Sequence, residues 1–280
     1  MQLVIISGLS GSGKSVALAV LEDAAYYCVD NLPASLLIET VAFLRNAGYE
    51  RLAVTVDARS GPALAELPSA ALGLRAQGVD VRLLVLDAKN DALIRRFSET
   101  RRRHPLAHDQ LTLDESIARE RELLAEVMEI GHRIDTSELA PNALRAWIKE
   151  FIASDRSGMT LLFESFGFKQ GIPLDADLVF DVRSLPNPFY DPQLRSLTGL
   201  DAPVVAFLDA LPEAAALLAD IGDFVARWLP SFVRDNRAYL TVALGCTGGQ
   251  HRSVYFAERL ARRFRPAAPV LVRHRQLARP

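Results

Sequence analysis

Residues 3–15 read Leu-Val-Ile-Ile-Ser-Gly-Leu-Ser-Gly-Ser-Gly-Lys-Ser, and this stretch decides the fold. It opens with an apolar run from Leu3 to Ile6, which is typical of a buried strand, and the residues from Lys14 to Glu22 have the pattern of a helix. Between them, glycines supply the backbone freedom that a tight turn requires. We therefore predict that the chain begins with a strand, a turn and a helix, the first unit of a parallel α/β sheet.

The same stretch has the spacing G-x-x-x-x-G-K-[ST] of a phosphate-binding loop, or P-loop. In such a loop, backbone N–H groups and the N-terminus of the helix surround phosphate oxygens, the lysine reaches the β and γ phosphates, and the last hydroxyl binds Mg²⁺. We predict that Mg²⁺ enters with the nucleotide and is held at Ser15. The residues predicted to bind a nucleoside triphosphate are Gly8, Leu9, Ser10, Gly11, Ser12, Gly13, Lys14 and Ser15.

The rest of the chain predicts two α/β domains. With 280 residues, half of them apolar, the chain exceeds the size at which one hydrophobic core usually stops growing. Strand patterns at 52–56 and 81–86 alternate with helical patterns, which predicts a P-loop, kinase-like domain with a mostly parallel sheet at residues 1–153. Small and polar residues at 154–158 predict a linker. Residues 159–280, with strand patterns at 160–163, 178–180 and 239–244, predict a second α/β domain.

Composition and charge argue against several classes of protein. The net charge is −2, from 32 basic and 34 acidic residues, which argues against a surface devoted to nucleic acid or membrane. The two cysteines, Cys28 and Cys246, are far apart, which argues against a disulfide framework or a zinc site. No run reaches the roughly 20 apolar residues that span a bilayer, and the N-terminus lacks a basic leader. We therefore expect a cytoplasmic protein without a membrane partner.

Two further features of the first domain bear on phosphate chemistry. Asp30, Asp57 and Asp87 each follow a strand pattern, so each is a candidate for organising Mg²⁺, and the sequence does not choose among them. A basic cluster is similar to the arginine-bearing lid of small-molecule kinases, which neutralises charge on a transferring phosphoryl group. The alternative is a solvated helix face. The cluster comprises Arg95, Arg96, Arg101, Arg102, Arg103 and His104. A P-loop small-molecule kinase is therefore one alternative function.

A second loop with phosphate-binding features follows the strand pattern at 239–244. It is preceded by a strand and followed by a helix, so successive N–H groups and a helix N-terminus surround one concavity. The spacing C-x-x-G-x-x-R-S is also that of cysteine-dependent phosphatases, in which a thiolate attacks phosphorus and the arginine clamps the phosphoryl oxygens. A glycine-rich turn with a buried cysteine is the other alternative. The predicted anion-binding residues are Cys246, Thr247, Gly248, Gly249, His251, Arg252 and Ser253.

The C-terminal end of the chain is basic. From Arg259 onward it holds seven arginines and neither a lysine nor a carboxylate side chain. Because arginine contacts phosphates in a bidentate manner, we predict that Arg273, Arg275 and Arg279 contact RNA. A basic helix face with a frayed tail is the alternative.

With both loops in place, the chain resembles the RapZ family of nucleotide-binding proteins, also described as RNase adapter proteins. The resemblance covers nearly the whole chain and rests on several blocks. These blocks are residues 8–15, 27–33 (Tyr-Cys-Val-Asp-Asn-Leu-Pro), 100–105 (Thr-Arg-Arg-Arg-His-Pro), 163–169, 181–188, 198–201 and 245–253.

The resemblance implies a set of ligands and partners. It implies that Gly8 to Ser15 bind ATP, that the segment assigned to GTP comprises Asp57, Ala58, Arg59 and Ser60, and that either nucleotide is hydrolysed weakly. It also implies a homo-oligomer. In enteric members the C-terminal domain binds small regulatory RNA and the aminosugar phosphate glucosamine-6-phosphate, and so links aminosugar supply to RNA decay by an endoribonuclease. Carried over, the loop at 246–252 holds the sugar phosphate rather than attacking it.

Overall fold

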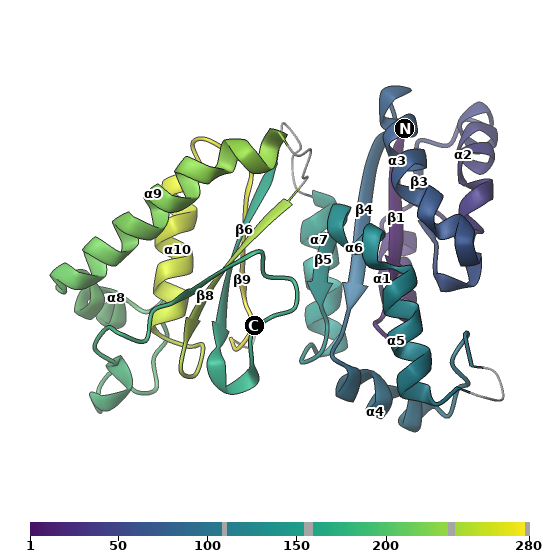
Figure 1. Ribbon diagram of the computed structural model, residues 1–280. Coiled ribbons are helices and arrows are strands. Elements are labelled where there is room, and N and C mark those ends of the chain that lie inside the picture. Colours follow the sequence, from purple (N-terminus) through teal and green to yellow (C-terminus); the bar gives the residue numbers. More distant parts are fainter. Residues whose placement is uncertain (108–110, 154–158, 235–238, 278–280) are drawn as a thin grey trace. The chain divides into compact units, whose positions relative to one another are not determined.

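The computed structural model describes residues 1–107, 111–153, 159–234 and 239–277 (Figure 1). The chain divides into two compact units, Met1–Ala153 and Ser154–Pro280. Each unit contains its own parallel sheet, as the α/β prediction required. The segment predicted as a linker, 154–158, lies outside the described residues.

The first domain is built on a five-stranded sheet whose paired strands all run parallel. The strand order is β2-β3-β1-β4-β5, so the strand that leads into the P-loop lies in the middle. The carboxyl ends of β1, β3 and β4 therefore meet at one edge of the sheet. The strands are β1 (Gln2–Gly8), β2 (Tyr27–Val29), β3 (Arg51–Thr55), β4 (Asp80–Asp87) and β5 (His132–Asp135).

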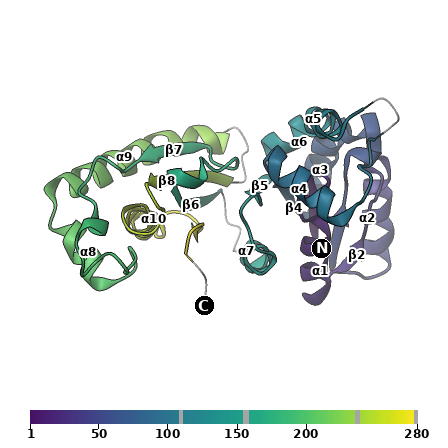
Figure 2. The ribbon, with the colours of Figure 1, turned by 90° about the horizontal axis from the view of Figure 1, so that it is seen from below.

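Helices cover both faces of this sheet (Figure 2). On one face, Leu3, Ile5 and Leu83 belong to a buried cluster with residues of α2, α3, α5 and α6. On the other face, α1 packs against α7 and contacts β1 and β3. An all-parallel sheet is stable when both faces are covered in this way. The helices are α1 (Lys14–Asp23), α2 (Leu37–Asn46), α3 (Leu67–Ala76), α4 (Asn90–Thr100), α5 (Leu113–Leu123), α6 (Ala125–Ile130) and α7 (Pro141–Ala153), with 3-10 turns η1 (Ala34–Leu36) and η2 (Ala58–Glu66).

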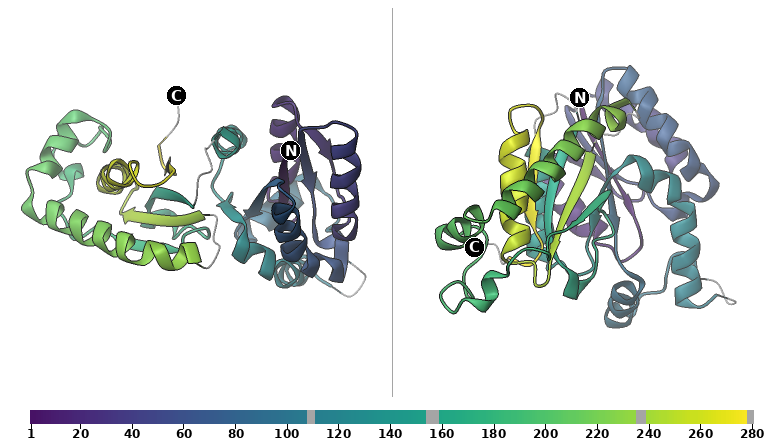
Figure 3. Two further views of the ribbon diagram at one scale, coloured as in Figure 1. Left: turned by 90° about the horizontal axis from the view of Figure 1, so that it is seen from above. Right: turned by 60° about the vertical axis from the view of Figure 1, so that its left-hand side comes forward.

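The second domain has a four-stranded sheet in the order β7-β8-β6-β9, with all pairs parallel. Helix α10 packs on β6, β8 and β9, and α8 and α9 pack on α10 (Figure 3). The strands are β6 (Thr160–Gly167), β7 (Leu178–Asp181), β8 (Tyr239–Cys246) and β9 (Val270–His274). The helices are α8 (Ala202–Asp209), α9 (Pro212–Arg234) and α10 (Arg252–Phe264), with 3-10 turns η3 (Phe168–Gln170) and η4 (Pro188–Tyr190).

Two strands were not predicted from the sequence, β5 and β9. Both are short, and both contain charged residues inside otherwise apolar runs, which hides the strand pattern. Strand β9 changes the interpretation of the C-terminal end, because residues 270–274 pair with β6 instead of forming a basic helix face or a frayed tail. Within the described part of the chain, no helix is both long enough and apolar enough to cross a membrane.

The position of Gly8 at the end of β1 allows no side chain. Its φ is +128°, and a Cβ atom there would lie 2.0 Å from the carbonyl oxygen of Leu86 in β4. Gly48 offers a matched control, because its φ is +87° and a Cβ atom there would meet nothing within 4 Å. The two sites therefore separate the cost of the backbone conformation from the cost of the collision.

We predict that Gly8→Ala lowers the free energy of unfolding of the first domain by more than about 3 kcal/mol, whereas Gly48→Ala lowers it by about 1–2 kcal/mol. Urea denaturation followed by the fluorescence of Trp147, which is 2% exposed in this domain, measures both changes. A Trp228→Phe background removes the only other tryptophan of the sequence. Equal losses in the two variants would show that the contact with β4 does not constrain Gly8.

Candidate functional site

The loop from Gly8 to Ser15 leaves the end of β1 and runs into the first turn of α1. The backbone N–H of Leu9 donates to the Leu86 carbonyl at 3.1 Å, and the N–H of Ser12 donates to the Leu9 carbonyl at 3.1 Å. Gly13 has a φ of 108° and precedes the first helical residue, Lys14. Since the helix begins at Lys14, its N-terminal N–H groups and its partial positive charge face the concave side of the loop.

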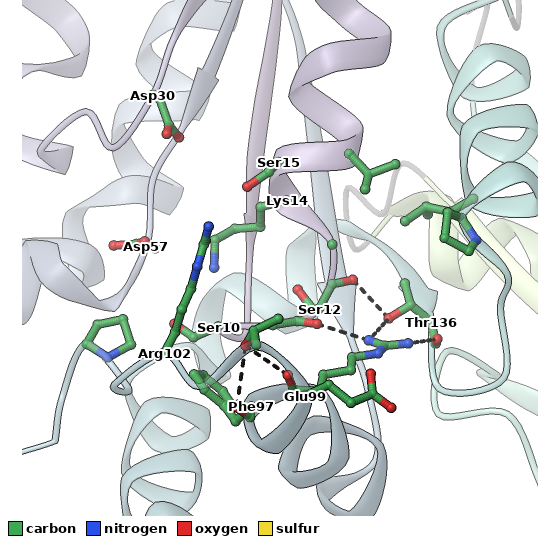
Figure 4. A pocket seen from close by; sticks show the side chains of 18 of the residues that line it. Ser10, Ser12, Lys14, Ser15, Asp30, Asp57, Phe97, Glu99, Arg102 and Thr136 are labelled. Carbon is green, nitrogen blue, oxygen red and sulfur yellow. Dashed lines mark hydrogen bonds between the residues drawn. The ribbon is translucent and has the colours of Figure 1, made fainter.

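A cavity of about 700 Å³ lies against this loop (Figure 4). Residues from Ser10 to Val16 line it, together with residues that follow β2, β3 and β5 and residues of α4 and α7. Its basic residues outnumber its acidic ones, which suits a polyanionic ligand. The charged residues that line it are Lys14, Arg59, Arg96, Arg102 and Arg103, and Asp30, Asp57 and Glu99.

Lys14 is held at the cavity by the loop itself. Its Nζ donates to the carbonyl oxygens of Gly8 at 2.6 Å and Leu9 at 3.1 Å. Burial lowers the pKa of Lys14 from its ordinary value of 10.5, although the nearby carboxylates of Glu120 and Asp57 act in the opposite direction. An ammonium group that has lost water and has only carbonyl partners gains strongly from a phosphate oxygen.

The structure separates the three aspartates that the sequence left as candidates for Mg²⁺. Asp87 is fully buried, and its two carboxylate oxygens accept hydrogen bonds from Arg121 at 2.8 Å and Arg133 at 3.0 Å. The Oδ1 atom also accepts from the N–H of Ala88 at 2.8 Å. Because two arginines already neutralise this carboxylate, and because Asp87 does not line the cavity, we exclude it as a metal ligand.

Asp57 has a carboxylate oxygen that can bind a metal ion. It is 3% exposed, its Oδ1 accepts from the N–H of Arg59 at 3.0 Å, and its buried Oδ2 accepts no hydrogen bond, with Arg59 Nε 3.5 Å away. Asp30 lines the same cavity, and the Thr55 hydroxyl fixes it by donating to its Oδ1 at 2.6 Å. Figure 4 shows Asp30 and Asp57 on the same side of Lys14 and Ser15.

These donors fit Mg²⁺ bound together with a nucleotide. Magnesium in such sites keeps several waters and takes one or two carboxylates plus phosphate oxygens, so it does not need a cage of protein ligands. Among the described residues, no cluster of three or more His, Cys, Asp or Glu suited to a metal is found. The buried Asp57 Oδ2 and the Ser15 hydroxyl are the two protein groups that would contact the metal in such an arrangement.

The two predicted nucleotide segments line one cavity. From the segment 57–60, Asp57 and Arg59 face the cavity that the P-loop lines. Ala58 is buried, and the Ser60 hydroxyl accepts the N–H of Ala34 at 3.2 Å. The segment assigned to GTP is therefore part of the P-loop site.

The members of the basic cluster at 95–104 lie in different environments. Arg96 donates to the carbonyl of Gly11 at 3.0 Å and to the carbonyl of Thr136 at 2.5 Å, so it joins the P-loop to the end of β5. Arg102 and Arg103 line the cavity, and Arg95 and Arg101 are exposed. His104 is buried, which the prediction of a basic lid did not anticipate.

Glu120 is a site residue that the sequence reasoning missed. It lies on α5, is fully buried, and accepts the N–H of Ser10 at 2.9 Å and the hydroxyl of Ser10 at 2.8 Å. Burial alone would raise the pKa of Glu120, but the hydrogen bond from His104, the charge of Lys14 and the bonds from Ser10 outweigh it and lower the pKa. The signal was present in the sequence, because Glu120 stands three residues after Ile117 and four before Leu124 on the apolar face of a helix.

The second predicted loop also lies between a strand and a helix. Cys246 ends β8, and its Sγ accepts the N–H of Gly249 at 3.2 Å and lies 3.2 Å from the Ser253 hydroxyl. Burial would raise the pKa of the Cys246 thiol, but the hydrogen bonds from Ser253, Gly249 and His251 outweigh it and lower the pKa from 9.0. The hydrogen bonds at the base of this loop therefore make the thiol easier to ionise than a free cysteine.

Arg252 presents one edge toward the loop. Its Nη1 donates to the carbonyls of Arg183 at 3.0 Å and Leu185 at 2.7 Å, whereas Nη2 has only a 3.4 Å contact with the Thr247 hydroxyl. The buried Nε donates to no acceptor. Among the described residues, the Nε–Nη2 edge, which is one of the edges with which arginine binds oxyanions in a bidentate manner, therefore has only the long contact with Thr247.

The remaining members of this loop differ in accessibility. Thr247 is exposed and Gly248 is half-buried, so both can face a bound anion. His251 is buried, and its Nε2 lies 3.3 Å from the carbonyl oxygen of Leu194, away from the cysteine. His251 therefore contributes its backbone to the loop and not its ring.

The prediction that Arg273 and Arg275 contact RNA is wrong, because both side chains are buried. Arg273 is 0% exposed within β9, and the Arg275 side chain is 5% exposed and lies 3.5 Å from Glu164 and 3.8 Å from Asp175. Both guanidinium groups are inside the second domain, where a phosphate backbone does not reach them. Arg279 lies outside the described residues.

Comparison with known families assigns both domains. Residues 1–156 match the RapZ-like N-terminal domain, and residues 159–278 match the RapZ C-terminal domain. The chain belongs to the RapZ family. The two matches cover the P-loop cavity and the Cys246 loop, so both sites of this RapZ-family protein lie within its family domains.

Curated relatives agree over the full length. A nucleotide-binding protein of Azoarcus sp. (strain BH72) is 62% identical over 280 residues, which are 100% of this chain and 96% of the relative. A nucleotide-binding protein of Thiobacillus denitrificans is 62% identical over 278 residues, which are 99% of this chain and 100% of the relative.

Among solved structures, the RapZ-family chain is similar to small-molecule kinases over about half its length. A sugar kinase from Janibacter sp. HTCC2649 is 18% identical with a TM-score of 0.35, covering 55% of this chain and 96% of the kinase. Shikimate kinase from Bacteroides thetaiotaomicron is 13% identical with a TM-score of 0.38, covering 54% of this chain and 97% of the kinase.

Proposed function

We propose that this RapZ-family protein binds a nucleoside triphosphate with Mg²⁺ in the cavity of the first domain. The observation that carries the proposal is that one cavity lined by the P-loop contains both Lys14 and Asp57, whose buried Oδ2 accepts no hydrogen bond among the described residues. Lys14 can bind an anion, and the Asp57 carboxylate can bind a cation or a water bound to that cation. The full-length relatives, which carry the name nucleotide-binding protein, support the same conclusion.

Each residue has a distinct task in this proposal. The N–H groups at the start of α1 and the Lys14 ammonium bind phosphate oxygens, for which Lys14 leaves the carbonyls of Gly8 and Leu9. Ser15 and Asp57 would hold Mg²⁺, which would neutralise phosphate charge when bound. Because the segments at 8–15 and 57–60 line one cavity, we further propose that ATP and GTP compete for it. Any hydrolysis is slow and secondary to binding.

Calorimetric titration of Mg–ATP tests this assignment. We expect Lys14→Ala to weaken binding at least about tenfold, because it removes a charge-assisted phosphate contact. Asp57→Asn should weaken binding about tenfold in Mg²⁺ and leave it unchanged in EDTA, since the lost interaction passes through the metal. GTP added in excess should abolish the ATP signal.

The control is Asp23→Asn, an equal charge change at an exposed position at the end of α1, which should bind as the wild type does. Binding of GTP that survives Lys14→Ala would contradict the single cavity. Loss of affinity in Asp57→Asn that persists in EDTA would contradict the metal role.

We also propose that the Cys246 loop binds a phosphorylated metabolite, with an aminosugar phosphate such as glucosamine-6-phosphate as the first candidate. The available Nε–Nη2 edge of Arg252 supports this second site. Binding is favoured over attack by the thiol, because a phosphatase needs an acid that protonates the leaving oxygen. The carboxylate at the neighbouring strand end, Asp181, is paired with Arg183, whose hydrogen bonds lower its pKa, so it carries no proton to donate.

For the second site, we predict that Arg252→Lys weakens glucosamine-6-phosphate binding about tenfold, because lysine keeps the charge and loses the bidentate edge. Arg262→Lys, at an exposed position of the same helix, is the matched control. Cys246→Ser should retain binding, and reduced wild-type protein should not hydrolyse para-nitrophenyl phosphate. Hydrolysis that disappears in Cys246→Ser would establish the phosphatase instead. Calorimetry measures the binding, and absorbance measures the hydrolysis.

A further inference from the structure

A buried carboxylate joins the P-loop to the arginine segment, defined as residues 101–103. Glu120 Oε2 accepts the N–H of Ser10 at 2.9 Å and lies 3.0 Å from His104 Nε2, while its Oε1 accepts the Ser10 hydroxyl at 2.8 Å. All three side chains are buried, with exposed fractions of 0% for Glu120, 3% for His104 and 7% for Ser10. We call this group of three residues the Glu120 bridge.

The hydrogen bonds indicate which tautomer the His104 ring adopts. His104 Nδ1 accepts the N–H of Leu106 at 3.1 Å, so this nitrogen carries no proton. The ring proton therefore sits on Nε2 and is donated to Glu120. The carboxylate thus receives three donors, which is the number that keeps a buried carboxylate ionised.

The bridge is anchored at both ends by rigid structure. Helix α5, which carries Glu120, begins with a capping box in which the Thr112 hydroxyl and Glu115 bond each other's backbone N–H groups. The His104 ring packs 5.2 Å from the ring of Phe97 on α4. The position of His104 is therefore fixed, and this fixes the positions of the residues immediately before it.

The residues immediately before His104 are the arginines that line the cavity. The chain leaves α4 at Arg101, whose φ of 51° turns it sharply, and Arg102 and Arg103 then line the cavity before the chain is fixed again at His104. Figure 4 shows the Arg102 side chain extending into the cavity in the direction of Lys14. Lys14 and Arg102 thus belong to one cavity, and cations gathered in this way point to a site for phosphate oxygens.

We propose that Glu120 and His104 are positioning residues that hold Arg102 and Arg103 on the terminal phosphate of a nucleoside triphosphate bound in the P-loop. The proposal rests on the proposed nucleotide function. An ionised carboxylate placed on the apolar face of α5 is costly to bury, and an apolar residue would pack there without that cost. Its place, between the P-loop and the arginine segment, gives the carboxylate a task beyond packing.

A double-mutant cycle tests the proposal with Mg–AMP-PNP and Mg–ADP as probes. His104→Phe keeps a buried ring and removes the donor to Glu120, and the double variant Arg102→Ala/Arg103→Ala removes the two exposed cations. We expect His104→Phe to weaken AMP-PNP binding about tenfold and ADP binding less than about threefold. In the Arg102→Ala/Arg103→Ala background, His104→Phe should change AMP-PNP affinity less than about twofold, because its effect passes through the arginines.

Conservative rescue and a stability measurement complete the design. His104→Gln, whose amide N–H takes the place of Nε2–H, should restore AMP-PNP affinity to within about threefold of the wild type. Thermal unfolding of each variant is recorded separately, since a purely structural role would lower the Tm without distinguishing AMP-PNP from ADP. If His104→Phe does not fold, Glu120→Gln replaces it in the same cycle.

The outcomes are distinct. An equal loss of AMP-PNP affinity with and without the arginines, or no loss in either background, would overturn the positioning role while leaving the nucleotide site intact. Failure of the wild-type protein to bind AMP-PNP at all would instead overturn the proposed nucleotide function.

Discussion

The close approach of Gly8 to Leu86 constrains everything that follows at the first site. Because a Cβ atom at Gly8 would meet the β4 backbone at 2.0 Å, β1 ends against its neighbour and the loop must begin at that residue. The loop then curves with its backbone N–H groups on the inner side, and α1 starts at Lys14 with its positive end facing the cavity. The strand order places Asp57, which follows β3, and Thr136, which follows β5, at the same edge of the sheet.

The second domain repeats this arrangement with different chemistry. A parallel strand again ends at a glycine-containing loop and a helix begins at Arg252, so backbone N–H groups gather at one end of the sheet. Here the groups that face the loop are a thiol with a lowered pKa and the unpaired edge of one arginine, instead of a lysine and an aspartate. The same strand–loop–helix arrangement thus underlies both proposed sites, one for a triphosphate with its metal and one for a single phosphate.

Sequence reasoning found the parts of these sites that are contiguous in the chain. The eight residues from Gly8 to Ser15 and the eight from Cys246 to Ser253 form recognisable spacings, and the structure places both between a parallel strand and a helix. It could not choose among Asp30, Asp57 and Asp87, because the choice depends on Arg121 and Arg133, which neutralise Asp87 from elements distant in sequence. The place of Glu120 on an apolar helix face was visible in the sequence, but its partners Ser10 and His104 are brought to it only by the fold. Arg273 and Arg275 were misjudged because their burial follows from the pairing of β9 with β6, which the sequence did not reveal.

A crystal structure of the protein with Mg²⁺ and AMP-PNP tests the central claim most directly. We predict triphosphate density within the loop at 8–15, the Lys14 Nζ moved from the Gly8 carbonyl to a phosphate oxygen, and the metal between the Ser15 hydroxyl and the Asp57 carboxylate. Phosphates bound outside this cavity, or a metal held without Asp57, would contradict it.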